Sequence, residues 1–90
     1  MRITVEYLAQ LRVAAGTSRA EVECPDGSTV TALVAQLADT HGEAFRSLAL
    51  DEEGAVRRTL LVAAGGRRVA GSDPLREGDV LILGTPIAGG

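Results

Sequence analysis

The sequence predicts an α+β domain in which a mixed sheet of four to five strands carries one main helix on one face. Two early segments alternate apolar and polar residues, and a fully apolar run stands near the C-terminus, which predicts strands. Between them, one segment repeats apolar residues every three or four positions, which predicts a helix. A helix crossing between early and late strands lets the first and last strands lie side by side.

Two strands are expected at the start of the chain. Residues 2–8 and residues 19–24 both alternate between apolar and polar side chains, as strands with one buried face do. Residues 9–18 are expected to form a long loop with a turn at Gly16. The two strands are therefore predicted to form an antiparallel hairpin.

The main helix is expected to follow the break at residues 25–27, which read Pro-Asp-Gly. Ser28 or Thr29 is a suitable N-cap, and Gly42 is suited to end the helix. One apolar stripe runs along the segment between them: Val30, Leu33, Val34, Leu37, Ala38 and His41.

Strands also dominate the second half of the chain. Residues 58–64 and 67–70 are predicted to be strands joined by a turn at residues 65–66, while residues 43–50 fit either a short helix or an irregular stretch. The last predicted strand, residues 80–83, is apolar at every position. Such a run is typical of a central strand buried on both faces.

The composition of the chain argues against some classes of function. Ninety residues allow one domain, and the net charge of −3 argues against binding to nucleic acid. Tyr7 and Phe45 are the only aromatic residues, so base stacking has little support. No apolar run approaches the ~20 residues that cross a bilayer, and no signal peptide is evident. We expect a cytoplasmic protein that binds neither nucleic acid nor membrane.

Side-chain catalysis finds little support in the sequence. His41 is the only histidine and is suited to the negative end of the helix dipole, and Cys24 is expected to be a packing residue. The carboxylates at 51–53 lack the ligand spacing of a calcium loop. We therefore expect no catalytic site within the domain. Four arginines could cluster if the third and fourth strands pair, giving either solubility or a basic rim for a partner: Arg57, Arg58, Arg67 and Arg68.

One face of the sheet is a candidate partner surface. A single helix covers one face only, yet apolar residues occur on both faces of the first and last strands. Leu8 is expected to be exposed on the open face, together with Leu61 and Leu83 if the strand register allows it, and a contiguous apolar patch there marks a partner site. The alternative is that the loop at 9–18 or the segment 43–58 covers this face.

The C-terminal tail is the second candidate site. We expect residues 1–84 to form the domain and residues 85–90 to form a flexible tail that ends in Gly89 and Gly90. Glycine has no Cβ and accepts almost any backbone geometry, so such a tail could enter a narrow channel and present its carboxylate. Pro86, which is followed by Ile87 and Ala88, limits the number of free torsions.

These features together resemble the ubiquitin-like β-grasp sulfur carriers of the MoaD/ThiS family. The resemblance rests on the strand and helix order, the segment 75–80 (Leu-Arg-Glu-Gly-Asp-Val) and the Gly-Gly end. The segment 7–12 (Tyr-Leu-Ala-Gln-Leu-Arg), followed by Gly16-Thr17, is most similar to the small subunit of molybdopterin synthase.

The resemblance implies a mechanism at Gly90. An E1-like partner would use ATP to adenylate the Gly90 carboxylate, and a sulfur source would displace AMP to leave a thiocarboxylate. The large subunit of molybdopterin synthase, or another sulfur-accepting enzyme, would then receive the sulfur, and the chain itself would bind no cofactor or metal. The alternatives are a carrier for cysteine, thiamine or another thiolated metabolite, a ubiquitin-like protein modifier, and a plain interaction domain.

Overall fold

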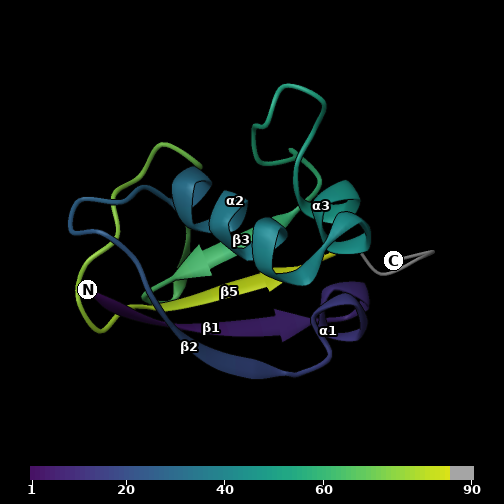
Figure 1. Ribbon diagram of the computed structural model, residues 1–90. Coiled ribbons are helices and arrows are strands. Elements are labelled where there is room, and N and C mark those ends of the chain that lie inside the picture. Colours follow the sequence, from purple (N-terminus) through teal and green to yellow (C-terminus); the bar gives the residue numbers. More distant parts are fainter. Residues whose placement is uncertain (86–90) are drawn as a thin grey trace.

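A five-stranded mixed sheet forms the centre of the computed structural model, which describes residues 1–85 (Figure 1). The strand order is β2-β1-β5-β3-β4. The first and last strands are parallel neighbours at its centre, and the other neighbours are antiparallel. The α+β prediction, with a mixed sheet of four to five strands and a main helix on one face, is confirmed. The elements are β1 (Arg2–Leu8), α1 (Gln10–Ala15), β2 (Arg19–Glu23), α2 (Val30–His41), α3 (Glu43–Ala49), β3 (Leu61–Ala64), β4 (Arg67–Arg68) and β5 (Val80–Gly84).

The main helix α2 forms where the apolar stripe predicts it. Its N-cap is Thr29, whose side-chain oxygen accepts a hydrogen bond from the Ala32 N–H at 3.2 Å. Gly42 ends the helix with φ 96°, a backbone conformation that suits a residue without Cβ. In Figure 1, α2 and α3 lie over the same side of the sheet.

The core lies between the sheet and the helices. Side chains alternate across each strand, so every second residue of β1, β3 and β5 faces the helices. The buried apolar residues include one from the short helix α1 and two from α3. The largest fully buried side chains are Tyr7, Phe45, Ile3, Leu11, Leu33, Leu37, Leu81, Leu83, Val5, Val30 and Val34.

A short helix occupies part of the predicted loop at 9–18. This expectation is wrong for Gln10–Ala15, which form α1. The helix contains good helix formers, and Leu11 anchors it with a fully buried side chain. Gly16 ends it in the left-handed conformation, φ 77°. Burial of one leucine selects the helix, and an isolated six-residue segment would not be stable as a helix.

The residues at 43–50, which fitted two alternatives, form the helix α3. Phe45 and Ala49 enter the same core as α2 and leave no exposed surface. Strand β4 is shorter than predicted and spans two residues. The tight turn before it has positive φ at both Gly65 (61°) and Gly66 (80°), as a two-residue hairpin turn requires.

The last strand β5 is central, as predicted, but it is not buried on both faces. Leu81 and Leu83 are fully buried against the helices, whereas Val80 is 37% exposed and Ile82 is half-buried. Helices α2 and α3 lie on one side of the sheet, and Val80 and Ile82, which point to the other side, remain accessible. No helix in the described residues has the length and apolar character needed to cross a membrane.

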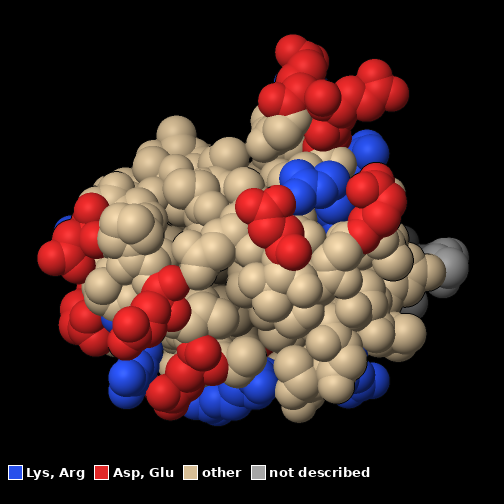
Figure 2. All heavy atoms as spheres, viewed as in Figure 1, with Lys and Arg blue, Asp and Glu red and all other residues tan. Residues whose placement is uncertain are grey.

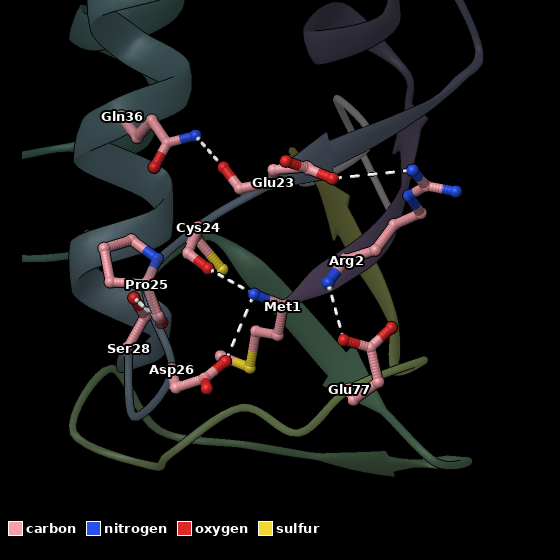
Figure 3. Close-up of polar contacts among 9 residues, drawn as sticks. All are labelled: Met1, Arg2, Glu23, Cys24, Pro25, Asp26, Ser28, Gln36 and Glu77. Carbon is pink, nitrogen blue, oxygen red and sulfur yellow. Dashed lines mark hydrogen bonds and ion pairs between the residues drawn. The ribbon is translucent and has the colours of Figure 1, made fainter.

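The start of the chain is held by its own α-amino group (Figure 3). The Met1 ammonium donates to the Cys24 carbonyl at 2.7 Å and lies 3.2 Å from a carboxylate oxygen of Asp26. Arg2 continues the attachment, because its N–H donates to Glu77 at 3.0 Å. These contacts join β1 to the segment that follows β2 and to the turn before β5.

This amino group makes the stability depend on pH. The hydrogen bond that it donates to Asp26 raises the pKa of the Met1 ammonium above its usual value of 8.0. The contact therefore stabilises the fold fully below about pH 8 and is lost as pH rises through the higher folded-state pKa. We expect the urea midpoint to fall between about pH 7 and 9.5, and Asp26→Asn to flatten that slope. Equal slopes for both proteins would contradict the assignment.

Candidate functional site

The open face of the sheet is the first candidate site, and it is set by strand register. Leu8 of β1 and Leu61 of β3 both pair with Gly84 of β5. Directly opposed residues point to the same face, so these two leucines flank a glycine. A Cβ at Gly84 would lie 3.2 Å from the Leu8 Cβ and 3.7 Å from Leu61 Cδ2. The missing side chain therefore lets the two leucines approach each other across β5.

Leu83 does not belong to this face. It is fully buried on the helix side, where it pairs with Tyr7 and Val62, so the expectation that it is exposed is wrong. A difference of one residue in register moves a side chain to the other face of a sheet. The side chains that β5 contributes are instead those of Val80, which pairs with Thr4, and Ile82, which pairs with Glu6 and Ala63.

The open patch therefore consists of apolar side chains from three neighbouring strands. Leu8 is 43% exposed and Val80 is 37% exposed, while the others are half-buried. The segment 43–58 does not cover it, because Phe45, Ala49 and Leu50 are buried in the core. Helix α1, which replaces the expected loop, likewise buries Leu11 in that core. We call this surface the open patch: Leu8, Leu61, Ala63, Val80 and Ile82.

Charged residues bound the open patch on the side of β2. Arg19 of β2 lies 3.2 Å from the Glu6 carboxylate of β1, and Arg2 lies 3.4 Å from Glu23. Cross-strand pairs of this kind are exposed and add little to stability. They give the sheet an apolar half over β5 and β3 and a charged half over β2 and β1.

The root of the tail lies at one end of the open patch. The Thr85 hydroxyl oxygen accepts a hydrogen bond from the Gln10 N–H at 3.2 Å, which ties the end of β5 to the start of α1. Thr85 is the last described residue. The tail residues predicted to act, Pro86, Ile87, Ala88, Gly89 and Gly90, lie outside the described part of the chain.

Backbone strain is concentrated beside this root. Ala9 has φ 56° and ψ −130°, and it is the only non-glycine residue with positive φ in the described structure. It turns the chain out of β1 and into α1, so that Gln10 faces Thr85. A side chain in this region costs on the order of 1–3 kcal/mol, and such outliers often occur near functional sites.

We expect Ala9→Gly to stabilise the domain by about 0.5–1 kcal/mol, because glycine relieves the strain but has more freedom in the unfolded chain. Ala14→Gly within α1 is the matched control and should destabilise by about 1 kcal/mol. Chemical denaturation measures both. A loss of stability in Ala9→Gly would show that the turn is unstrained.

The residues considered for side-chain chemistry have structural roles. His41 Nε2 lies 3.1 Å from the Tyr7 hydroxyl, and its ring packs against Phe45 with centroids 5.1 Å apart. Burial raises the pKa of the Tyr7 hydroxyl. Cys24 is buried, as expected of a packing residue. Asp51 folds its carboxylate back on its own loop, where it accepts from the N–H groups of residues 53 and 55.

Residues 1–85 contain no group of three or more His, Cys, Asp or Glu side chains that could bind a metal ion together. Figure 2 shows acidic side chains gathered on the loop that projects after α3, where residues 51–53 lie. The described structure therefore has an accessible apolar surface and a positioned root for the tail.

Comparison with known proteins supports this description. A family model described as the ThiS family matches residues 5–90. The crystal structure of SAMP1 from Haloferax volcanii superposes with a TM-score of 0.90 at 24% identity, over 100% of both chains. The putative molybdopterin converting factor, subunit 1, from Pyrococcus furiosus is 30% identical over 97% of this chain and 99% of that one, with a TM-score of 0.79.

A third structure, the Amycolatopsis orientalis BexX/CysO complex, matches at 24% identity over 98% of this chain and 99% of that one, with a TM-score of 0.75. Structures at this identity show that the fold is shared. No curated protein sequence matches.

The sequence-based predictions missed Ile82, Gly84 and Ala9. Strand alternation could have found Ile82, because it stands two residues from Val80.

Proposed function

Because this chain belongs to the ThiS family of ubiquitin-like β-grasp sulfur carriers and modifiers, we propose that it carries sulfur as a thiocarboxylate at Gly90. The observation that supports the proposal most is that the family match extends to residue 90 and includes the Gly-Gly end. The central position of β5 adds support, because this strand leads from the core directly to Thr85 beside the open patch.

The proposed chemistry has two steps, both on the Gly90 carboxyl group. A carboxylate oxygen attacks the α-phosphorus of ATP held by an E1-like partner, and pyrophosphate leaves. A persulfide sulfur of the partner system then attacks the acyl carbon of the mixed anhydride and displaces AMP. A thiol reductant cleaves the resulting acyl disulfide, which leaves the thiocarboxylate on Gly90. ATP is bound by the partner, and this chain supplies the acyl group and the surface that the partner binds.

We further propose molybdenum cofactor biosynthesis as the pathway, with this chain as the small subunit of molybdopterin synthase. The 30% identity to a putative molybdopterin converting factor subunit supports this choice. The large subunit of that synthase would then receive the sulfur. A carrier for cysteine, thiamine or another thiolated metabolite is the alternative, since a CysO complex also shares the fold. A protein modifier is the other, since SAMP1, a small archaeal modifier protein, does too.

Intact-mass measurement tests the carrier proposal. The chain is incubated with an E1-like enzyme, ATP and a sulfur source. Exchange of one carboxylate oxygen for sulfur should raise its mass by roughly 16 Da, the mass difference between the two atoms. Omitting ATP is the control. An unchanged mass under conditions that thiolate a known carrier would refute the proposal. A high-mass adduct that survives thiol reductant would instead identify a modifier.

The open patch is proposed as the surface that the partner enzyme binds. Leu8→Asp places a charge at the most exposed member of the patch, and burial of an unpaired carboxylate in an interface is unfavourable. We expect it to weaken binding to the E1-like enzyme by at least about tenfold. Ala44→Asp, on an exposed position of α3, is the matched control and should bind normally. Calorimetric titration measures both, and equal affinities for the two variants would exclude the patch.

A further inference from the structure

Arginines without a carboxylate partner are concentrated at one edge of the sheet. Arg2, Arg19 and Arg46 each lie within ion-pair distance of a carboxylate. No such pair exists within residues 1–85 for the other six arginines. Arg12 lies on α1, and the remaining five are exposed on β4, on the turn before β5 or on the loop before β3. We call this group the arginine edge: Arg57, Arg58, Arg67, Arg68 and Arg76.

The arginine edge is concave. One hollow of about 490 Å³ is lined by Arg67, Arg68 and Arg76, and a second of about 370 Å³ is lined by Arg57, Arg58 and again Arg68. Arg68 thus lines both hollows and connects the two groups of arginines. Guanidinium groups bind carboxylates through paired, parallel hydrogen bonds, and a hollow lets several of them act on one ligand.

The carboxylates in the first hollow are engaged with the backbone. Asp73 accepts a hydrogen bond from the Ala70 N–H at 2.8 Å, and Asp79 accepts one from the Arg76 N–H at 2.8 Å. With these two carboxylates set against the five arginines, the edge has a formal charge of +3, in a chain whose net charge is −3. The positive charge is therefore local and is opposite in sign to the net charge of the molecule.

Arg68 joins the arginine edge to the open patch, whereas Arg67 pairs with Ala64, the neighbour of the buried Leu81, and so points to the helix side of the sheet. Arg68 pairs with Ala63 of β3, which in turn pairs with Ile82 of β5, so the three side chains form one row across the open face. Arg68 and Ala63 form a pair that exchanges no backbone hydrogen bonds, because Val69 donates to Val62 and the tight turn closes at residues 64 and 67. The N–H and C=O of Arg68 point away from the sheet, toward solvent.

We propose that the arginine edge binds an acidic, extended segment of the partner protein that occupies the open patch. Carboxylates of that segment would pair with the arginines, and its backbone could reach the free N–H and C=O of Arg68. This inference rests on the proposed function for the role of the open patch, and it adds the partner's chemistry and orientation. The acidic segment fixes which end of the patch the partner covers.

A row of exposed arginines could also have roles that involve no acidic peptide. A short, charged edge strand protects a sheet from pairing with other chains, and that role needs no ligand. A small-anion site would bind phosphate as well as a peptide. A nucleic-acid site would need bases to stack, and the described edge contains no aromatic residue. The acidic segment accounts for both the charge and the extended shape of the surface.

The test is an NMR titration of the ¹⁵N-labelled chain with a blocked hexaglutamate peptide, with hexaglutamine as the neutral control. We expect shift changes concentrated at residues 57–58, 64–69 and 76, and affinity that falls as salt rises. Arg67→Gln/Arg68→Gln should weaken binding about five- to tenfold, an estimate for two exposed charge pairs. Arg19→Gln/Arg46→Gln removes the same charge elsewhere and should have less than about a twofold effect.

Three results would overturn the inference. Scattered shifts, or equal losses in both double variants, would show a nonspecific response to net charge. Binding of inorganic phosphate at the same affinity would indicate a small-anion site. Tighter binding of a single-stranded oligonucleotide would indicate a nucleic-acid surface. The titration requires neither a reaction at the tail nor the E1-like enzyme, so its failure would leave the thiocarboxylate proposal unaffected. Failure of the thiocarboxylate proposal would likewise leave the titration result unchanged.

Discussion

Removing Gly90 is expected to abolish thiocarboxylate formation while the free energy of unfolding stays within about 0.5 kcal/mol of its original value. The reacting group is the terminal carboxylate, and deletion shortens the tail by about 3.5 Å. A misplacement of about 1 Å can already reduce a rate by on the order of a hundredfold, so the loss should exceed that. Every buried apolar residue of the described core lies between Ile3 and Leu83, so the fold should be unaffected.

Two measurements on the same preparation separate chemistry from folding. Intact mass reports the oxygen-to-sulfur exchange, and urea denaturation reports stability. Glu52→Gln, on the projecting loop, is a control that should react normally. A truncated chain that gains the mass increment at an undiminished rate would refute Gly90 as the reacting residue. A truncated chain that unfolds early would instead show that the tail contributes to the fold.

Phe45→Ala is expected to cost about 3–5 kcal/mol of unfolding free energy, the usual range for a buried phenylalanine. The ring is fully buried and makes an edge-to-face contact with Tyr7, with centroids 5.8 Å apart. It also packs against His41 and attaches α3 to α2. Domains of this size have about 5–15 kcal/mol of stability, so the expected loss is a large fraction of the total.

Leu48→Ala on the same helix is the control, because Leu48 is only half-buried and should cost about 1 kcal/mol. Denaturant midpoints and slopes measure both variants, and an unchanged slope would show that two-state unfolding is retained. A loss below about 1.5 kcal/mol for Phe45→Ala would mean that the core around α3 rearranges to fill the space.

The two edges of the sheet differ in a way that bears on partner choice. On the side of β2, Arg2 and Arg19 are paired with glutamates, whereas Arg67 and Arg68 of β4 have no such partner in residues 1–85. A partner that meets β4 with carboxylates would gain attraction there, and it would meet neutralised charge on the opposite side. Electrostatic complementarity of this kind sets orientation and association rate more than affinity.

The local sequence pattern by itself determined the main helix and the first strand, and it indicated the family. The stripe from Val30 to His41 has one helical solution, and the alternation in residues 2–8 has one strand solution, because each buries a single apolar face. Connection rules allowed the first and last strands to be neighbours, and the structure pairs them. The Gly-Gly end, together with the motifs that resemble the sulfur carriers, indicated the family.

Tertiary structure decided what depends on register and on distant neighbours. Leu83 and Ile82 are adjacent and equally apolar, yet only the pairing of β5 with β1 and β3 sends one to the core and the other to the open patch. Helices α1 and α3 are six and seven residues long, too short to be stable alone, and burial of Leu11 and Phe45 selects them. The arginine edge exists only because the fold brings residues 57–58 and residue 76 next to Arg67 and Arg68 of β4.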